Sequence, residues 1–241
     1  MIKLRMMNLF HRPLLYLSFK GFISNDLFMS DAVSSARKDY AKGALHKEDL
    51  PANPMLLLNQ WVADAAEVDP EDYNAMCIAT HSLSGGSNGR IVLLRALEDD
   101  CLRFFTNYES EKGKEILASP QVACIFFWKE LERQLRVRGK AVPSSDAVSD
   151  AYFASRPRSS QIGAWASRQS RQGEEVKLTE RINSYKAQFE GQDVIPRPPF
   201  WGGFDIYADE IEFWQGRPSR LHNRYLYTKQ GPSWSLGRLD P

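Results

Sequence analysis

Hydrophobic positions follow one period near the start of the chain and another in its middle, and this change predicts the order of the elements. Over residues 54–67 apolar side chains recur at the spacing of one helical face. After that helix, apolar runs of strand length alternate with turn-forming residues. The runs predict strands over residues 75–81, 90–96, 101–106, 122–128 and 131–142, with a Gly-rich turn over 83–89 and a short helix over 111–118.

The pattern continues to the C-terminus with three helices followed by four strands. Serine caps and a proline delimit helices over residues 144–155 and 161–168, and a charged segment with an apolar stripe predicts a third over 172–190. Strands are predicted over residues 204–207, 211–215, 221–228 and 234–239, as an antiparallel meander. The order helix, strands, helices, strands predicts an α+β fold built on an antiparallel barrel.

Residues 1–28 have a composition unlike the rest of the chain. They are basic, carry no acidic residue before Asp26, and contain an apolar run at residues 14–17 that is too short to span a bilayer. We interpret them as an extension from an earlier initiation codon, outside the fold. An organellar targeting segment is the alternative, since transit peptides are also basic and acid-poor. Residues 29–53 then form a polar N-terminal segment, and residues 54–241 form one barrel domain.

Composition changes this picture little, but it excludes several classes of protein. In 241 residues, 43% are hydrophobic and 25% charged, as in ordinary soluble globular proteins. A formal net charge of +1 gives no reason to expect nucleic acid or an anionic membrane as a partner. The cysteines and histidines are scattered without metal-binding spacing, so we expect no metal and a reducing, cytoplasmic compartment. These residues are Cys77, Cys101, Cys124, His11, His46, His81 and His222.

Common phosphate-binding and metalloprotease motifs are missing from the sequence. It contains no P-loop, no GxGxxG after a strand and no HExxH. A bound phosphate would therefore be held by side chains. One candidate cluster has Tyr152 and Arg156 on a shared helical face, with Ser160 at the start of the next helix. Taken alone, a capping serine and an arginine at a helix end are the more common explanation of such a cluster.

Near the C-terminus, three basic or titratable side chains recur at every second residue. Arg220, His222 and Arg224 would lie on one face of a strand, where their mutual repulsion requires an anion opposite them. A phosphate or carboxylate ligand fits that requirement, and so does solvent. Near the other end of the chain, Arg37 and Tyr40 are spaced as neighbours on a helix that Gly43 would end.

These features come together in a resemblance to a known family. The stretch EFWQ followed by RLHNR, residues 212–224, resembles the signature of the pyridoxine/pyridoxamine 5′-phosphate oxidases. The likeness covers residues 36–241 without a large gap. Supporting motifs are RKDYAKGAL (37–45), DLPANP (49–54), RIVLL (90–94), FTN (105–107), LERQ (131–134), SRPRSSQIGAW (155–165) and FWGG (200–203).

The resemblance implies a fold, an activity and an assembly. It implies an antiparallel split β-barrel with flanking helices, working as a homodimer with FMN at the subunit interface. The family oxidises pyridoxine or pyridoxamine 5′-phosphate to pyridoxal 5′-phosphate, with dioxygen as acceptor and release of hydrogen peroxide. Two alternatives stay open. One is a related split-barrel flavoenzyme acting on another aromatic metabolite, such as a phenazine precursor. The other is a non-catalytic binder of FMN or pyridoxal phosphate.

Site residues follow from the same resemblance, position by position. The implied FMN-binding set is Arg90, Ile91, Val92, Leu93, Leu94, Arg95, Phe105, Thr106, Lys112, Gln134, Gln169, Ser170, Trp214 and Arg224. The implied substrate-binding set is Arg37, Tyr40, Arg95, Tyr152, Arg156, Ser160, Arg220 and His222. Within it, Arg37 and Tyr40 would form a lid. Arg220 and His222 are the implied catalytic residues, which would orient the pyridine ring.

Four positions depart from the family pattern. Arg95 stands where lysine is usual, which keeps the charge but adds a planar fork. Glu111 stands where an arginine commonly helps to hold the FMN phosphate, so flavin affinity is expected to fall, although Lys112 remains. Asn223 replaces a more common aspartate, and Phe105 replaces a frequent tyrosine.

Overall fold

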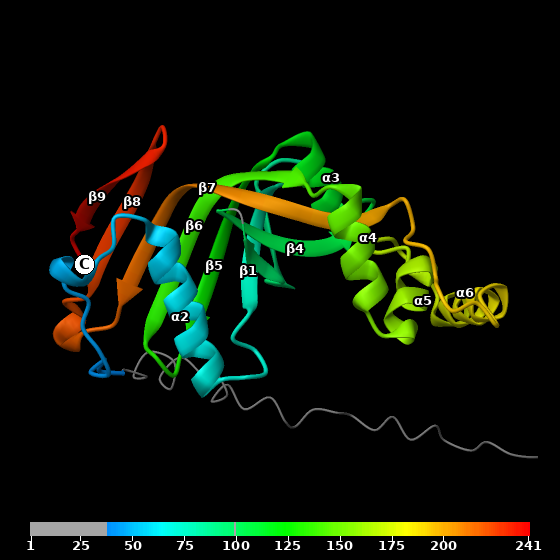
Figure 1. The fold of residues 1–241 in the computed structure, drawn as a ribbon, viewed down its shortest axis with the longest axis horizontal. Coiled ribbons are helices and arrows are strands. Elements are labelled where there is room, and N and C mark those ends of the chain that lie inside the picture. The colour runs from blue at the N-terminus through cyan, green and yellow to red at the C-terminus, as the bar shows by residue number, and fades with distance from the viewer. Residues whose placement is uncertain (1–37, 99) are drawn as a thin grey trace, which may run out of the picture. The chain divides into compact units, whose positions relative to one another are not determined.

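The computed structural model describes residues 38–98 and 100–241, and residues 39–241 form one compact unit (Figure 1). The predicted extension over residues 1–28 and the predicted lid residue Arg37 lie outside the described residues. In chain order the elements are η1 (Lys47–Asp49), α2 (Pro54–Val68), β1 (Ala75–His81), β2 (Ser87–Leu93), β3 (Ala96–Glu98), β4 (Cys101–Asn107), α3 (Glu111–Ala118), β5 (Gln121–Trp128), β6 (Arg133–Pro143), α4 (Asp146–Ser155), α5 (Arg158–Ala166), α6 (Glu175–Gln188), β7 (Trp201–Gln215), η2 (Pro218–Arg220), β8 (Asn223–Gln230) and β9 (Ser233–Leu239).

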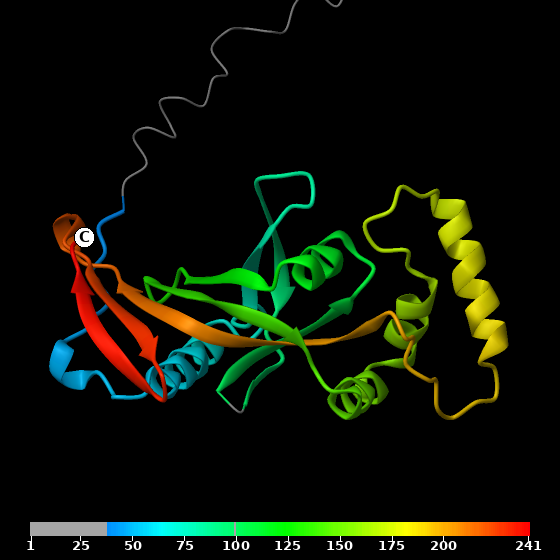
Figure 2. The same ribbon diagram turned by 90° about the horizontal axis from the view of Figure 1, so that it is seen from above.

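The strands of the described residues form one antiparallel, nine-stranded sheet that curls into half a barrel. Its order is β2-β1-β5-β6-β7-β4-β3, while β8 pairs with the second half of β7 and β9 pairs with β8. The long strand β7 crosses the fold, with α4, α5 and α6 at one of its ends and β8 and β9 at the other (Figure 2). These features confirm the predicted α+β class and the split-barrel fold.

Strand β7 is continuous where the sequence pattern predicts two strands, so that prediction is wrong. Its first half pairs with β4 and its second half with β8, while β6 pairs with residues 204–215 and so bridges the two halves. The pairing with β6 shifts between Arg138 and Gly139. Residues 208–210, which separate the two predicted strands, therefore form a β-bulge rather than a loop. A Cβ on Gly139 would lie 2.1 Å from the carbonyl oxygen of Tyr207, and this bulge therefore requires glycine.

Helix α2 begins and packs as its sequence predicts. The Asn53 side chain accepts a hydrogen bond from the Met55 amide at 3.0 Å, and Pro54 occupies the first turn. The buried side chains of α2 recur at helical spacing and join the main core with side chains from the sheet. At 15 residues α2 is the longest of the described helices, and none of these is long and apolar enough to cross a membrane.

A second, smaller core lies where α4, α5 and α6 meet the start of β7. Helix α5 begins at Arg158, earlier than predicted, because Pro157 occupies the position before its first turn. Ser160 therefore lies inside the first turn of α5 rather than ahead of the helix. The buried members of this core are Phe153, Ile162, Phe189, Ile195 and Trp201.

The N-terminal segment lacks the helix that its spacing predicts. Residues 38–46 have no helical structure, and η1 is a single 3₁₀ turn. The prediction that Gly43 ends a helix carrying Tyr40 is therefore wrong for the described part of the chain. The segment is held instead by hydrogen bonds to the turns at the ends of β5 and β7.

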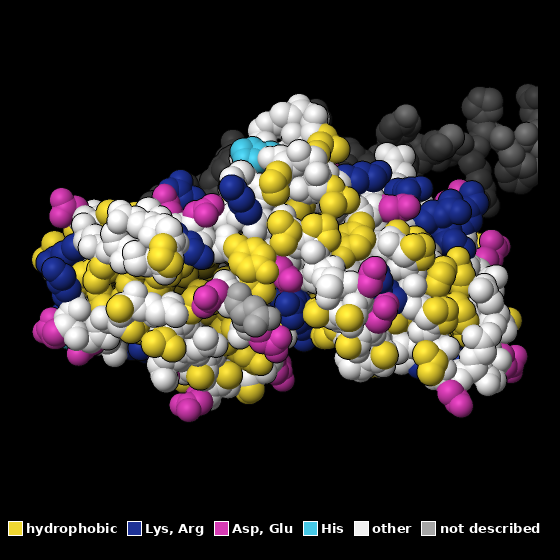
Figure 3. All heavy atoms as spheres, turned by 45° about the horizontal axis from the view of Figure 1, so that its top comes forward, with side chains coloured by type: hydrophobic (Ala, Val, Ile, Leu, Met, Phe, Trp, Pro, Cys, Tyr) yellow, Lys and Arg dark blue, Asp and Glu magenta, His cyan; other side chains and the backbone are white. Residues whose placement is uncertain are grey.

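Several large hydrophobic side chains remain on the surface of the fold. Ile91, Leu93 and Phe127 are exposed by 65%, 38% and 55%, although all three are in strands. Figure 3 shows one face on which hydrophobic side chains gather over the middle of the molecule, between groups of charged side chains. Contiguous apolar surface of this kind is typical of proteins that bind another chain.

Candidate functional site

A pocket opens between β2, β4, α4 and α5, where the second core meets the sheet. Its volume of about 480 Å³ is within the range of ~300–1,000 Å³ that is usual for small-molecule sites. Arg95, Lys112 and Arg156 contribute three cations to the lining, whereas none of the described lining residues is acidic. The pocket therefore suits a ligand with negative charge.

The Arg156 guanidinium is the most informative group in this pocket. Its Cζ lies 4.6 Å from the ring centroid of Trp201, and its Nη1 is buried without a hydrogen-bond partner among the described residues. Burial lowers the pKa of Arg156, and the charge of Arg95 also lowers it, while Tyr152 opposes them. The guanidiniums of Arg95 and Arg156 repel each other, and Arg156 has a buried donor without a partner among the described residues. This part of the pocket therefore suits an anion.

Flat aromatic rings form the wall beside this cationic end. Phe105 and Tyr152 stack with ring centroids 3.8 Å apart and an interplanar angle of 12°, and Trp201 lies 5.6 Å from Phe105 in a similar orientation. Ser160 lines the same pocket from the first turn of α5, where helix amides favour an anion. Rings and cations together fit a planar ligand that carries an acidic group.

A second group of cations lies on the side of the pocket nearer α3. Lys112 is buried, and its Nζ donates to Thr106 Oγ1 at 3.3 Å. Arg90 is held by Glu115, whose fully buried carboxylate accepts a hydrogen bond from Arg90 Nη2 at 2.9 Å. Burial acts to raise the pKa of Glu115, but its hydrogen bonds, including the one from Arg90, outweigh that effect and lower it. Glu115 thus remains an anion that fixes the Arg90 guanidinium.

The hollow beside these cations contains Glu111, one of the residues that depart from the expected pattern. It has a volume of about 390 Å³, and Arg90, Lys112 and Ser170 also line it. Burial lowers the pKa of Lys112, and Arg90 acts in the same direction, whereas Glu111 opposes both. The Glu111 carboxylate therefore offsets part of the local positive charge.

A third set of predicted residues, the C-terminal cluster, consists of Tyr40, Trp214 and His222. The Tyr40 ring lies edge-on to Trp214 at 5.5 Å and to His222 at 5.8 Å, and the rings of Trp214 and His222 are 4.5 Å apart. His222 Nδ1 accepts a hydrogen bond from the Arg217 amide at 3.1 Å, so the proton of the neutral ring is on Nε2. Burial lowers the pKa of His222, and the charge of Arg220 lowers it further, so the imidazole is neutral at neutral pH.

Arg220, His222 and Arg224 do not share one face of a strand, so that prediction is wrong. β8 begins at Asn223, whereas Arg220 ends η2 with a φ of 62°. A proline and left-handed backbone in this turn keep the chain out of strand conformation. Arg224 alone lies on the strand, where Glu212 accepts a hydrogen bond from its Nε at 2.8 Å. The anion opposite Arg224 is thus a carboxylate of the protein itself.

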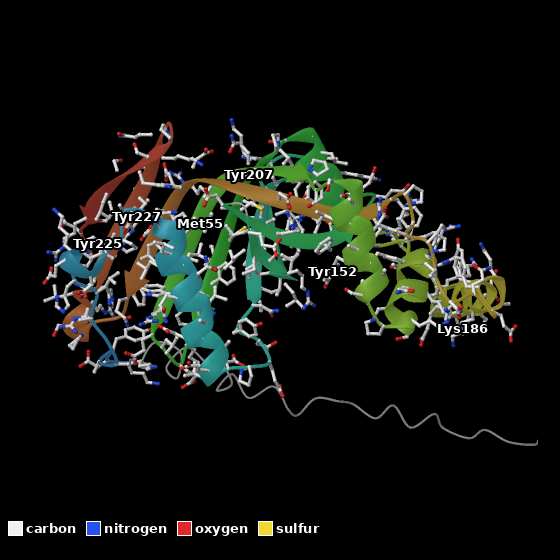
Figure 4. All side chains as sticks on the ribbon, in the orientation of Figure 1. Met55, Tyr152, Lys186, Tyr207, Tyr225 and Tyr227 are labelled. Carbon is white, nitrogen blue, oxygen red and sulfur yellow. The ribbon has the colours of Figure 1, made fainter. Side chains whose placement is uncertain are left out.

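The predicted site residues fall into two groups at opposite ends of β7. Gly203 lies beside the pocket through its pairing with β4, while Trp214 belongs to the C-terminal cluster. From Gly203 to Trp214 the strand spans about 36 Å at ~3.3 Å per residue. Figure 4 shows Tyr152 on α4, near the pocket, and Tyr225 on β8 at different ends of the fold. One small ligand cannot contact both groups within a single chain.

The structure assigns most predicted residues to one of these groups. The pocket and the adjoining hollow contain Arg90, Ile91, Val92, Leu93, Arg95, Phe105, Thr106, Lys112, Tyr152, Arg156, Ser160, Gln169 and Ser170. The far group contains Tyr40, Gln134, Trp214, Arg220, His222 and Arg224. Leu94 is buried in the main core and lines neither hollow. Sequence reasoning missed Trp201, which the FWGG motif could have indicated, and Glu115, for which the sequence holds no signal.

A curled antiparallel sheet with a cationic, aromatic-walled pocket beside β4 defines a split-barrel protein whose pocket suits a small anionic ligand. A sequence model described as pyridoxamine 5′-phosphate oxidase matches residues 63–183, and one described as the pyridoxine 5′-phosphate oxidase C-terminal dimerisation region matches residues 201–241. A pyridoxine/pyridoxamine 5′-phosphate oxidase from Rubrobacter xylanophilus is 44% identical over 210 residues, which cover 87% of this chain and 96% of that protein. Another from Cupriavidus taiwanensis is 45% identical over 212 residues, which cover 87% and 99%. The chain belongs to the pyridoxamine 5′-phosphate oxidase family of oxidoreductases.

Solved structures share the fold. PhzG from Burkholderia lata, in complex with tetrahydrophenazine-1-carboxylic acid, has a TM-score of 0.75 at 27% identity, over 82% of this chain and 98% of that chain. A pyridoxamine 5′-phosphate oxidase-related, FMN-binding protein from Nostoc punctiforme has a TM-score of 0.63 at 18% identity, over 79% and 100%. The second likeness shows the fold alone.

Proposed function

We propose that the protein oxidises pyridoxine 5′-phosphate and pyridoxamine 5′-phosphate to pyridoxal 5′-phosphate, with FMN as cofactor and dioxygen as electron acceptor, and releases hydrogen peroxide. The observation that carries this proposal is the buried Nη1 of Arg156, which has no partner among the described residues and belongs to a pocket with three cations. A planar ring with a phosphate group matches that donor and the aromatic wall. The names of the relatives supply the substrate class.

The residues around the pocket fit FMN. Arg90 and Lys112 are cations for its phosphate, and Gln169 and Ser170 line the same hollow. β2 is an edge strand of the described sheet, so the outward backbone groups of residues 91–93 are available to hydrogen-bond the flavin ring. When bound, FMN supplies the acceptor for the hydride that leaves the substrate.

Tyr152, Arg156 and Ser160 would anchor the substrate phosphate. Arg156 offers a charged donor, Ser160 a hydroxyl at a helix start, and Tyr152 a ring and a hydroxyl on the adjacent helix. These contacts are remote from the reacting carbon. Their binding energy would therefore fix the orientation of the pyridine ring toward the flavin.

The catalytic residues would come from a second copy of the chain. The C-terminal cluster lies about 36 Å along β7 from the pocket, at ~3.3 Å per residue. In a homodimer, Arg220 and His222 of one copy would complete the pocket of the other, with the neutral His222 donating from Nε2 to the ring substituents. The match of residues 201–241 to a dimerisation region supports this assembly.

The surface we propose for the second copy is the apolar outer face of β2 and β5. Ile91 and Leu93 lie two residues apart on β2, and Phe127 lies on β5, which pairs with the same strand, β1. Phe127 pairs with Gln134, and Gln134 pairs with Trp214. The apolar face is therefore continuous with a row of residues implied to bind FMN, so covering it would bring the two groups of site residues together.

Mixing two impaired variants tests the shared site. Arg156→Met weakens the phosphate anchor and Arg220→Ala removes a proposed catalytic side chain, so at a substrate concentration near the wild-type KM neither homodimer should show more than a small part of the wild-type turnover. A dimer with one copy of each variant has one intact site, so an equal mixture should recover about a quarter of the wild-type oxygen consumption. No recovery, with mixed dimers demonstrated by mass spectrometry, would contradict the shared site. Wild-type protein that loads FMN but oxidises neither vitamer would contradict the function.

A second candidate function is oxidation of an unphosphorylated aromatic acid. The likeness to PhzG, whose structure holds tetrahydrophenazine-1-carboxylic acid, favours it. Against it, a carboxylate carries less charge than a phosphate, and both Arg95 and Arg156 line the pocket. Inorganic phosphate should therefore compete with the true substrate in the oxygen assay. A protein that binds FMN and pyridoxal phosphate but consumes no oxygen would instead be a non-catalytic binder.

A further inference from the structure

A buried carboxylate far from the pocket holds the segment that carries Tyr40. Glu132 lies in the turn between β5 and β6, with 2% of its surface exposed and a φ of 53°. It belongs to the LERQ motif, of which the proposed function uses only Gln134. A buried acid in left-handed backbone conformation is unfavourable on both counts, so its contacts must compensate.

Glu132 joins the N-terminal segment to the end of β7. Its Oε2 accepts hydrogen bonds from the amides of Ala41 and Lys42, at 2.8 and 2.9 Å. Its carbonyl oxygen accepts another from the Gly216 amide at 2.8 Å. Bonds from two amides to one ionised oxygen are charge-assisted and stronger than neutral ones. Loss of this carboxylate would therefore release two consecutive amides at once.

Other hydrogen bonds also align residues 39–45. The Ser219 amide donates to Asp39 Oδ1 at 3.2 Å, and Lys42 Nζ donates to the carbonyl oxygen of Glu130 at 2.6 Å. Arg217 Nη1 donates to the carbonyl oxygen of Gly43 at 2.9 Å. The Leu45 amide donates to Asn223 Oδ1 at 3.1 Å, so asparagine keeps the acceptor oxygen that an aspartate would offer there. The Glu132 carboxylate accepts hydrogen bonds from two backbone amides and is thus the strongest of these contacts.

Tyr40 directly precedes the two anchored amides, and its ring packs against backbone. A Cβ on Gly216 would lie 2.7 Å from Tyr40 Cγ, so the ring fills the space that glycine leaves. The same ring lies edge-on to Trp214 and His222. Anchoring at residues 41 and 42 therefore fixes the position of the Tyr40 ring relative to His222.

We infer that Glu132 is a positioning residue for the substrate side of the site, which acts by fixing Tyr40 beside His222. Its role toward substrate rests on the proposed function, whereas its anchoring of residues 41 and 42 does not. Loss of the carboxylate should therefore raise KM more than it lowers kcat, because the residues proposed to bind FMN and the substrate phosphate are unchanged.

The experiment compares Glu132→Ala and Glu132→Gln in the FMN-loaded, full-length protein, with Glu130→Gln as the matched control. Glu130 lies in the same turn and contacts Lys42 Nζ at 3.4 Å, but that ion pair is exposed. Hydrogen exchange at the amides of Ala41 and Lys42 reports the anchor without any substrate. KM and kcat with pyridoxine 5′-phosphate report the positioning.

Glu132→Ala should speed exchange at both amides by about tenfold or more and raise KM about tenfold, while kcat changes by less than about twofold. Glu132→Gln keeps an acceptor oxygen and should lie between the wild type and Glu132→Ala in both measurements. Glu130→Gln should match the wild type.

If hydrogen exchange at the amides of Ala41 and Lys42 were as slow in Glu132→Ala as in the wild type, Glu132 would not anchor this segment. Faster exchange with an unchanged KM would overturn the positioning role. A parallel loss of kcat, flavin occupancy and Tm in both Glu132 variants would mark a general structural defect and also overturn it. If the wild-type protein oxidises neither vitamer, the proposed function and the role toward substrate both fail, and the exchange rates still decide the anchor.

Discussion

Replacing Arg156 with methionine should weaken binding of the substrate phosphate and at the same time stabilise the ligand-free protein. Methionine keeps an unbranched apolar stem and removes the guanidinium. In the fold, burial lowers the pKa of Arg156 and the charge of Arg95 adds to that effect, so the charged group is disfavoured where it lies. A bound phosphate reverses this balance because it gives the buried Nη1 an acceptor.

The two effects differ in size. A hydrogen bond between charged partners contributes about 1.5–3 kcal/mol, so losing the Arg156 contact should raise KM by about 10- to 150-fold. A buried donor without a partner costs about 1–3 kcal/mol, which the contact with Trp201 offsets by about 1 kcal/mol. The net gain for ligand-free Arg156→Met is about 1 kcal/mol, or a Tm higher by about 2–4 °C for a domain of this size.

Steady-state kinetics and thermal unfolding of the ligand-free protein measure the two effects, and Arg158→Met is the control. Arg158 is two residues away but donates to the carbonyl oxygens of Phe189 and Gln192, at 2.5 and 2.9 Å. These bonds satisfy the end of α6 and do not reach the pocket, so the control should lower Tm and leave KM unchanged. If Arg156→Met gave the same pattern as the control, Arg156 would be a structural residue and not a phosphate anchor.

Four further changes test other parts of the site. Phe127→Asp places a charge on the apolar face and should give a monomer by light scattering that consumes no oxygen with substrate. A stable dimer would refute that interface. Gly216→Ala presses on the Tyr40 ring and should raise KM more than it lowers kcat. Glu111→Arg exchanges an anion for a cation beside Lys112 and should tighten FMN by about tenfold in a fluorescence titration; an unchanged Kd would remove Glu111 from the flavin site. Because burial lowers the pKa of Lys112, FMN affinity should decline with rising pH earlier than an ordinary lysine would allow, and Lys112→Arg should abolish that decline.

Local sequence patterns predict the bounds of two elements correctly. The strand over residues 75–81 and the helix over 111–118 have the predicted bounds, because alternating burial in one and a serine cap in the other are local features. The errors near the C-terminus have a non-local cause. β7 continues through its polar interruption because β6 pairs alongside it, and η2 displaces Arg220 from the strand through left-handed backbone that two-residue spacing does not reveal.

The site residues were predictable as a set but not as an arrangement. The family resemblance implies that Arg156 and His222 act on one substrate, and only the fold shows that β7 separates them within one chain. The supporting carboxylates were not predictable at all. Glu115 and Glu132 act through contacts with residues remote in the sequence, and no motif links Glu132 to the amides of residues 41 and 42. The catalytic roles of Arg220 and His222 stay predictions until their variants are assayed.

Anaerobic reduction of the FMN-loaded protein tests the proposed oxidase function most directly. Adding pyridoxine 5′-phosphate or pyridoxamine 5′-phosphate without oxygen should bleach the visible absorption of the flavin, and admitting oxygen should restore it with release of hydrogen peroxide. Protein that cannot be loaded with FMN would contradict this function. So would loaded protein that dithionite bleaches and neither vitamer does.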